Sequence, residues 1–120
     1  MKHIKTIETL YNKAMTKYEK NKLALTDVGA VGVAKINGTM WGSTYRQERY
    51  KIEVSDNYIT LSHWGTQTLK IRKSDNEIVE YYGESNSDRD SMNTLLNLVD
   101  IYNVYFRYFP SKHEFIKEVR

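Results

Sequence analysis

Apolar residues recur every three or four positions through the first part of the chain. Between residues 3 and 20 the series is Ile4, Ile7, Leu10, Tyr11, Ala14, Met15 and Tyr18. This is the period of one face of an α-helix, so the pattern predicts an amphipathic helix over residues 3–20. Lys13, Lys17 and Lys20 fall on the opposite side, as expected for the solvated face of a surface helix.

Period-two alternation replaces the helical pattern from Arg49 onward. It predicts four successive strands, over residues 49–54, 59–64, 69–72 and 78–83, which form an antiparallel meander. The turns between them are placed at Asp56-Asn57, Gly65-Thr66 and Ser74–Glu77. Ahead of these strands, Asn37-Gly38 predicts a short hairpin, because a type I′ turn needs positive φ at both central residues.

A second helix is expected to begin at Ser87, whose hydroxyl can accept a hydrogen bond from an unpaired amide of the first turn. Asp90 then occupies the reciprocal position of a capping box. The apolar stripe of this helix consists of Met92, Leu95, Leu96 and Val99, and we expect it to pack on the sheet. A strand follows over residues 104–108, and Phe115–Val119 is interpreted as a last strand or a short helix.

These elements predict an α+β fold: an N-terminal amphipathic helix, an antiparallel meander sheet, a second helix packed on the sheet and a C-terminal strand hairpin. With 120 residues and no linker or internal repeat, we expect residues 1–120 to form a single domain. The chain has no cysteine, which excludes disulfides and thiolate metal sites and is typical of the reducing cytoplasm. Charged residues interrupt the first twenty positions, so neither a signal peptide nor a membrane span is expected.

Candidate catalytic groups are few. The three histidines, His3, His63 and His113, lie too far apart in sequence to suggest a zinc site, and we expect no cofactor. Alternation places His63 on the inner face of its strand, where a hydrogen-bonded core histidine is the simplest interpretation. The best constellation for chemistry is the carboxylate group Glu80, Glu84, Asp88 and Asp90, which could hold magnesium for phosphodiester cleavage. Helix capping is the stronger explanation of Asp88 and Asp90.

Charge and tyrosine content favour a binding protein. The net charge is +3 and ten residues are tyrosine, a residue that interfaces concentrate. Residues 76–100 hold one basic and six acidic residues, whereas the rest of the chain is basic. One predicted binding surface is a basic sheet face with flanking tyrosines, made of Arg49, Lys51, Lys70, Arg72, Arg107, Tyr45, Tyr58 and Tyr105. The alternative surface is the acidic turn around Glu84. We favour the basic face, because its rows converge from several strands.

Two stretches carry a resemblance to known proteins. They are LSHWGTQTL at residues 61–69 and YYGESNSDRDSMNTLL at residues 81–96. Together they resemble a small domain encoded by phages and mobile elements of Gram-positive bacteria, and similar small proteins include the type II-A anti-CRISPR inhibitors. The resemblance covers residues 50 to about 110. The Lys-rich first helix and the Gly-rich stretch at residues 24–44 lie outside it.

The resemblance implies an inhibitor that binds a type II RNA-guided nuclease, or its guide RNA, stoichiometrically and blocks DNA cleavage in the bacterial host cytoplasm. We expect no small-molecule substrate and no membrane partner. Two alternatives remain open. One is a nucleic-acid-binding accessory protein of a phage or mobile element, which would use the basic face. The other is a magnesium-dependent nuclease, which would use the four carboxylates.

Overall fold

The computed structural model describes residues 2–24, 29–39, 42 and 45–120, and for residues 2–4 only the backbone. Its elements, in chain order, are α1 (Lys2–Ala24), β1 (Val31–Thr39), β2 (Arg46–Ser55), β3 (Tyr58–His63), β4 (Thr66–Arg72), β5 (Glu77–Tyr81), α2 (Asn86–Leu98), β6 (Val104–Phe109), a 3₁₀ turn η1 (Pro110–Lys112) and β7 (Glu114–Val119). The predicted α+β class and order of elements are therefore confirmed.

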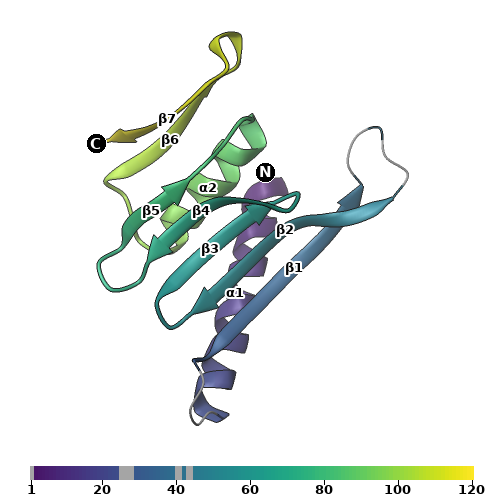
Figure 1. Ribbon diagram of the computed structural model, residues 1–120, viewed down its shortest axis with the longest axis vertical. Coiled ribbons are helices and arrows are strands. Elements are labelled where there is room, and N and C mark those ends of the chain that lie inside the picture. Colours follow the sequence, from purple (N-terminus) through teal and green to yellow (C-terminus); the bar gives the residue numbers. More distant parts are fainter. Residues whose placement is uncertain (1, 25–28, 40–41, 43–44) are drawn as a thin grey trace.

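A five-stranded antiparallel sheet in the order β1-β2-β3-β4-β5 forms the centre of the fold. Both helices lie on one side of it, behind the sheet in the view of Figure 1, and the other side carries neither helix. The helix-covered face supplies the core through the alternate residues Tyr50, Ile52, Val54, Ile59, Leu61, Leu69 and Ile71, all at most 6% exposed. The alternation in the sequence thus correctly predicted which side chains point inward.

Helix α1 buries Ile7, Leu10, Ala14 and Tyr18 against the sheet, at the spacing that the sequence predicted. It approaches β1 closely at Gly32. A Cβ placed there would lie 2.1 Å from the carbonyl oxygen of Ala14 and 2.4 Å from the amide nitrogen of Tyr18. Only glycine fits this crossing, because any side chain would meet helix backbone that cannot move aside.

Two polar side chains of α1 also bind the backbone of β1. The Lys17 ammonium donates to the carbonyl oxygen of Val33 at 3.1 Å, and the Asn21 amide donates to that of Val31 at 2.7 Å. Since β1 is an end strand of the sheet, these bonds satisfy carbonyl groups that no neighbouring strand can reach.

The predicted hairpin at Asn37-Gly38 is wrong. Strand β1 continues through both residues to Thr39, and neither has the positive φ of a type I′ turn. Instead, the register with β2 shifts between Ile36 and Asn37. Gly38 gives room to a neighbour, because a Cβ at this position would lie 3.1 Å from Cδ of Arg49.

The hairpin of β6 and β7 is a separate two-stranded sheet beside β5 (Figure 1). It resolves the interpretation of Phe115–Val119 in favour of a strand. The Phe106 ring packs on Tyr81 with a centroid separation of 5.2 Å. The Asn93 side chain in α2 donates to the Phe106 carbonyl oxygen at 3.0 Å and accepts from the Phe106 amide at 2.7 Å. This pair of bonds ties the hairpin to α2.

Within the described residues, neither helix combines the length and the apolar character that crossing a membrane requires.

Candidate functional site

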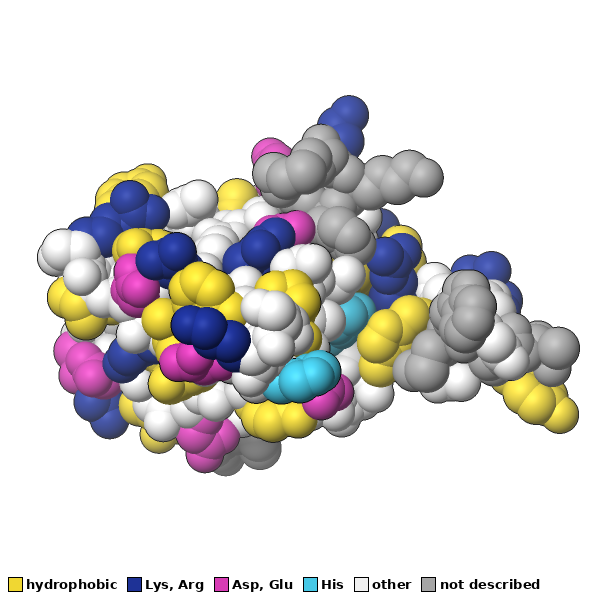
Figure 2. Space-filling view, turned by 90° about the horizontal axis from the view of Figure 1, so that it is seen from above, with side chains coloured by type: hydrophobic (Ala, Val, Ile, Leu, Met, Phe, Trp, Pro, Cys, Tyr) yellow, Lys and Arg dark blue, Asp and Glu magenta, His cyan; other side chains and the backbone are white. Residues whose placement is uncertain are grey.

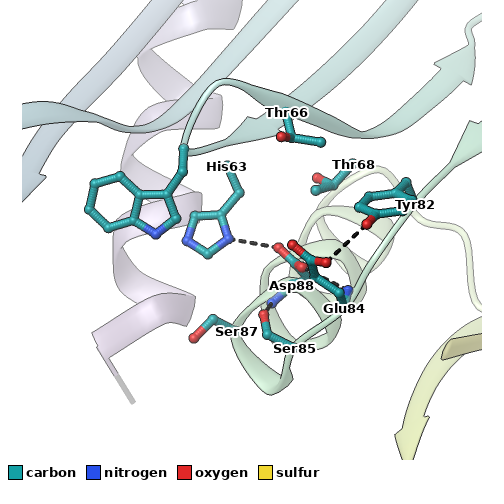
Figure 3. Close-up of a pocket in the computed structure, with 9 residues that line it drawn as sticks. His63, Thr66, Thr68, Tyr82, Glu84, Ser85, Ser87 and Asp88 are labelled. Carbon is teal, nitrogen blue, oxygen red and sulfur yellow. Dashed lines mark hydrogen bonds and ion pairs between the residues drawn. The ribbon is translucent and has the colours of Figure 1, made fainter. Parts of the chain in front are cut away.

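A pocket of about 510 Å³ opens between the β3–β4 turn, the chain that follows β5 and the start of α2 (Figure 3). We call it the α2 pocket. It is lined by His63, Trp64, Thr66, Thr68, Tyr82, Glu84, Ser85, Ser87 and Asp88. Its volume lies in the range of about 300–1,000 Å³ that is usual for small-ligand sites. The hydroxyl, carboxylate and imidazole groups drawn in Figure 3 converge from three segments on one space.

The turn between β3 and β4 consists of Trp64 and Gly65, one residue earlier than the predicted Gly65-Thr66. Both have positive φ, 51° and 82°, as a type I′ turn requires. Asn or Gly is favoured at the first of these positions, and a bulky aromatic residue there costs about 1 kcal/mol or more. The Trp64 amide donates to the carbonyl oxygen of Arg49 at 2.8 Å, which holds the turn. The strained position points to a role for the indole ring itself.

His63 forms the wall between the turn and α2. Its Nδ1 lies 2.7 Å from Oδ1 of Asp88, and the two side chains are only 8% and 7% exposed. The Tyr50 ring stacks on the imidazole at 4.4 Å with an interplanar angle of 8°. The prediction of a buried, hydrogen-bonded histidine is confirmed. A carboxylate can only accept, so Nδ1 carries a proton and donates it to Asp88.

Asp88 also organises the start of α2. Its second carboxylate oxygen accepts from the Glu84 amide at 3.0 Å, while its own amide donates to the Ser85 hydroxyl at 3.1 Å. Burial raises the pKa of the Asp88 carboxyl, but the hydrogen bonds from His63 and the Glu84 amide outweigh it. The pKa of Asp88 therefore lies below its ordinary value.

The predicted cap at Ser87 is wrong, because Ser85 is the N-cap of α2 and Ser87 lies inside the first turn. Asp88, rather than Asp90, takes the reciprocal position and reaches back to the Glu84 amide. Asp90 pairs with Arg89 at 2.9 Å. This correction leaves the Ser87 hydroxyl available to the pocket.

Several polar atoms of the pocket have no hydrogen-bond partner in the described part of the chain. They are Nε2 of His63, Nε1 of Trp64 and the hydroxyl groups of Thr66 and Ser87. Since no fully buried side-chain nitrogen or oxygen lacks a partner among the described residues, these atoms reach solvent. They are the groups through which a ligand could be recognised.

The charge of the lining is negative. Glu84 and Asp88 are its carboxylates, and none of the nine lining residues is Lys or Arg. The Tyr82 hydroxyl donates to Oε2 of Glu84 at 2.9 Å, and this bond raises the pKa of Tyr82. The other oxygen of the Glu84 carboxylate has no partner among the described residues. The pocket thus offers a free carboxylate oxygen beside a tyrosine ring that is 50% exposed.

The four carboxylates considered for magnesium are not brought together. Each has its own partner: Gln67 for Glu80, Tyr82 for Glu84, His63 for Asp88 and Arg89 for Asp90. Among the residues that the structure describes, no three His, Cys, Asp or Glu side chains are grouped as a metal ion would require. Their arrangement is explained by hydrogen bonding within the fold.

The predicted basic face is only partly assembled. Lys51, Lys70 and Tyr58 line a hollow of about 220 Å³ on the side of the sheet opposite the helices, which we call the open face. The Lys70 ammonium lies over the Tyr58 ring, 4.3 Å from its centroid. Arg72 is the cross-strand partner of Tyr58 and belongs to the same face.

Acidic groups accompany these cations. Lys70 is directly opposite Glu80 on β5, and Arg72 is opposite Glu77. The Arg72 guanidinium also makes two hydrogen bonds to the Asp75 carboxylate, at 3.1 and 2.9 Å. Figure 2, which views the molecule from above, shows basic and acidic side chains interspersed rather than a broad area of one sign.

The other members of the predicted basic face lie elsewhere. Arg49 sits at the register shift, and its guanidinium lies 5.4 Å from the ring of Tyr50, a residue of the helix-covered face. Arg107 and Tyr105 belong to the β6–β7 hairpin, where both bind Glu118. Tyr45 precedes β2 and is 77% exposed. The structure therefore groups Lys51, Lys70, Arg72 and Tyr58, and separates the remaining four.

Sequence reasoning named Glu84 but missed most of the pocket, above all Trp64, Thr66, Thr68, Tyr82 and Ser87. A signal was present, since all nine lining residues fall within the two stretches at residues 61–69 and 81–96 that carry the resemblance. These stretches were interpreted as turns and a helix cap. The structure shows that they also enclose one pocket.

The chain matches no protein-family model, no curated protein and no solved structure. The resemblance to small phage and mobile-element proteins stays a prediction.

Proposed function

We propose that this protein is a stoichiometric inhibitor that binds a type II RNA-guided nuclease through the α2 pocket and blocks DNA cleavage in the bacterial cytoplasm. The two stretches that resemble anti-CRISPR proteins supply every residue that lines the pocket. This convergence is the observation that carries the proposal. The stretches that form a turn and a helix cap therefore also enclose a space in which a ligand could bind.

The composition of the pocket supports a binding role. It combines two aromatic side chains, Trp64 and Tyr82, with several hydrogen-bonding groups that lack a partner among the described residues. Aromatic surface with a few convergent polar groups is the usual make-up of a recognition site. The rigid His63–Asp88 pair holds these groups in place.

A cleavage assay tests the proposal. Guide-loaded type II nuclease is incubated with increasing amounts of the protein and then given target DNA. We expect cutting to stop near an equimolar ratio, and the Glu84→Lys variant to require a much larger excess. Glu80→Lys is the matched control, because Glu80 is an acid of the neighbouring strand that does not line the pocket. Undiminished cutting at a many-fold excess of the wild-type protein would refute the function.

Nucleic-acid binding through the open face is the second candidate. The specific observation in its favour is the hollow in which Lys51 and Lys70 lie beside Tyr58. Lysines contact phosphates and release counterions, so binding would weaken steeply as salt rises. Gel shifts with single- and double-stranded RNA and DNA, and with bare guide RNA, at two salt concentrations test it. The absence of retardation at low salt would remove this candidate.

A further inference from the structure

We infer that the α2 pocket receives an arginine side chain of the partner protein, with its guanidinium group stacked on an aromatic side chain of the lining and its N–H groups directed at Glu84. The identity of the partner as a nuclease rests on the proposed function. The choice of arginine rests on the pocket's own charge, hydrogen-bonding capacity and shape.

Charge selects a cation. Glu84 and Asp88 are the charged carboxylates of the lining, and the hydrogen bonds that lower the pKa of Asp88 keep it ionised at neutral pH. None of the lining residues is Lys or Arg, so neither of these side chains repels a bound cation from the wall. A phosphate or a nucleotide would instead be repelled by both carboxylates.

The hydrogen-bonding pattern selects a ligand with several donors. Both oxygens of Asp88 are already occupied, by His63 and by the Glu84 amide. Glu84 retains one carboxylate oxygen, and the Thr66 and Ser87 hydroxyls can also accept. A guanidinium brings five N–H donors and no acceptor, so it complements this set better than a lysine ammonium, which brings three.

Shape selects a planar group. Two aromatic side chains, Trp64 and Tyr82, belong to the lining, and a guanidinium stacks on aromatic faces in a way that an ammonium cannot. The Trp64 ring is held in position by the strained turn, by the hydrogen bond from its amide to Arg49 and by contact with the His63 ring at 5.7 Å. An aromatic residue kept at such a turn position is accounted for when its ring is one wall of a binding site.

A small probe tests this inference without the nuclease. Nα-acetyl-arginine methylamide is titrated into the ¹⁵N-labelled protein at low ionic strength. The indole N–H signal of Trp64 is followed by NMR, and a Trp41→Phe variant assigns it, because the chain has two tryptophans. A single side chain should bind with a dissociation constant of about 1 mM. The matching citrulline derivative has nearly the same shape but no charge. It should bind at least about tenfold more weakly than the arginine derivative.

Two variants complete the experiment. Glu84→Gln should weaken arginine binding by about tenfold, because it removes the free carboxylate and keeps the shape of the side chain. Glu80→Gln, outside the pocket, should leave the titration unchanged. Equal binding of the citrulline derivative, an unmoved Trp64 signal at about 50 mM arginine derivative, or tighter binding of a mononucleotide would each overturn the inference.

The results separate this inference from the proposed function. If the protein blocks the nuclease but the arginine derivative does not bind the pocket, the function stands and the arginine assignment is wrong. If the derivative binds as expected but cleavage is unaffected, the pocket is an arginine site and the nuclease is not its partner.

Discussion

The α2 pocket and the open face of the sheet differ in how their polar groups are used. On the open face, Lys70 and Arg72 lie directly opposite acidic residues on β5, and Arg72 makes two further bonds to Asp75. In the pocket, both carboxylate oxygens of Asp88 are bonded, but Nε2 of His63, Nε1 of Trp64 and the Thr66 and Ser87 hydroxyls have no partner among the described residues.

The difference teaches that charge by itself is a poor guide to a binding surface. Exposed ion pairs contribute little free energy, and their charged groups already have each other as partners. A charged sheet face can therefore be an ordinary solvated surface. Hydrogen-bonding groups that line one pocket and have no partner among the described residues are more informative, because one ligand can bind several of them at once. The predictions below test this contrast.

The largest expected effect is on stability, at Asp88. The Asp88→Ala change leaves Nδ1 of His63 and the Glu84 amide without their acceptor, and should lower the free energy of unfolding by about 3 kcal/mol. Arg72→Ala on the open face removes a pair whose side chains are 42% and 50% exposed, and should lower the free energy of unfolding far less. Urea denaturation measures both. Equal losses would contradict the contrast.

The next effect is on binding. Glu84→Lys should weaken binding to the guide-loaded nuclease by about 30-fold or more, because it places a cation where we expect an arginine to bind. The double reversal Lys51→Glu with Arg72→Glu should change the affinity by about threefold or less. Surface plasmon resonance gives the affinities and rates, and circular dichroism confirms that each variant is folded. The opposite ranking would identify the open face as the binding surface, as the sequence alone had suggested.

A smaller effect distinguishes the two serines at the start of α2. Ser85→Ala removes the hydroxyl that accepts from the Asp88 amide, and should cost about 1 kcal/mol of unfolding free energy. Ser87→Ala should be nearly neutral for stability, since Ser87 makes no side-chain hydrogen bond to a described residue. Thermal or urea unfolding of the two variants compares them. A larger loss at Ser87 would mean that the cap has been placed at the wrong residue.

The smallest expected effect is the change of unfolding free energy at acidic pH. The pKa of Asp88 is lower in the folded protein than in the unfolded chain, so its contribution to stability is present above about pH 4 and is lost as the pH falls through the folded-state value. Asp75 behaves in the same direction because of its bonds to Arg72, but it is exposed. Salt at about 0.5 M should screen the contribution of Asp75 and leave that of Asp88.

Unfolding measured across the acid range in Asp88→Asn and Asp75→Asn variants checks this expectation. The loss of unfolding free energy in acid should be smaller in Asp88→Asn than in the wild type, both at low salt and at about 0.5 M salt. In Asp75→Asn it should be smaller only at low salt. If, at high salt, the Asp75 variant changed the loss of unfolding free energy more than the Asp88 variant, the result would contradict the difference in burial between the two regions.

Local pattern predicted the fold well because each helix and strand has a face to bury. The spacing of Ile7, Leu10, Ala14 and Tyr18 and the alternation through β2 to β4 identify inward side chains without knowledge of their neighbours. Turn chemistry was less reliable. Asn37-Gly38 has a favourable turn sequence, but pairing with β2 kept it in a strand, and Trp64-Gly65 forms a turn at which tryptophan is disfavoured.

The pocket could not be predicted because it depends on distant residues meeting. His63 and Asp88 are 25 positions apart, and their bond exists only when α2 packs across the end of β3. Through this bond Asp88 pairs with an imidazole, in addition to its expected role at the start of α2. The helix start was misplaced from Ser85 to Ser87 because both serines precede an acidic residue that could complete a capping box.

The bonds from Lys17 and Asn21 to β1 have a consequence for self-association. An end strand with free carbonyl groups is a template on which a strand of another molecule can add, and this is a common route to aggregation. Helix α1 occupies the carbonyl oxygens of Val31 and Val33, so an incoming strand would have to displace both side chains before it could pair there. The first half of β1 is therefore guarded against edge-to-edge assembly by the same helix that closes the core.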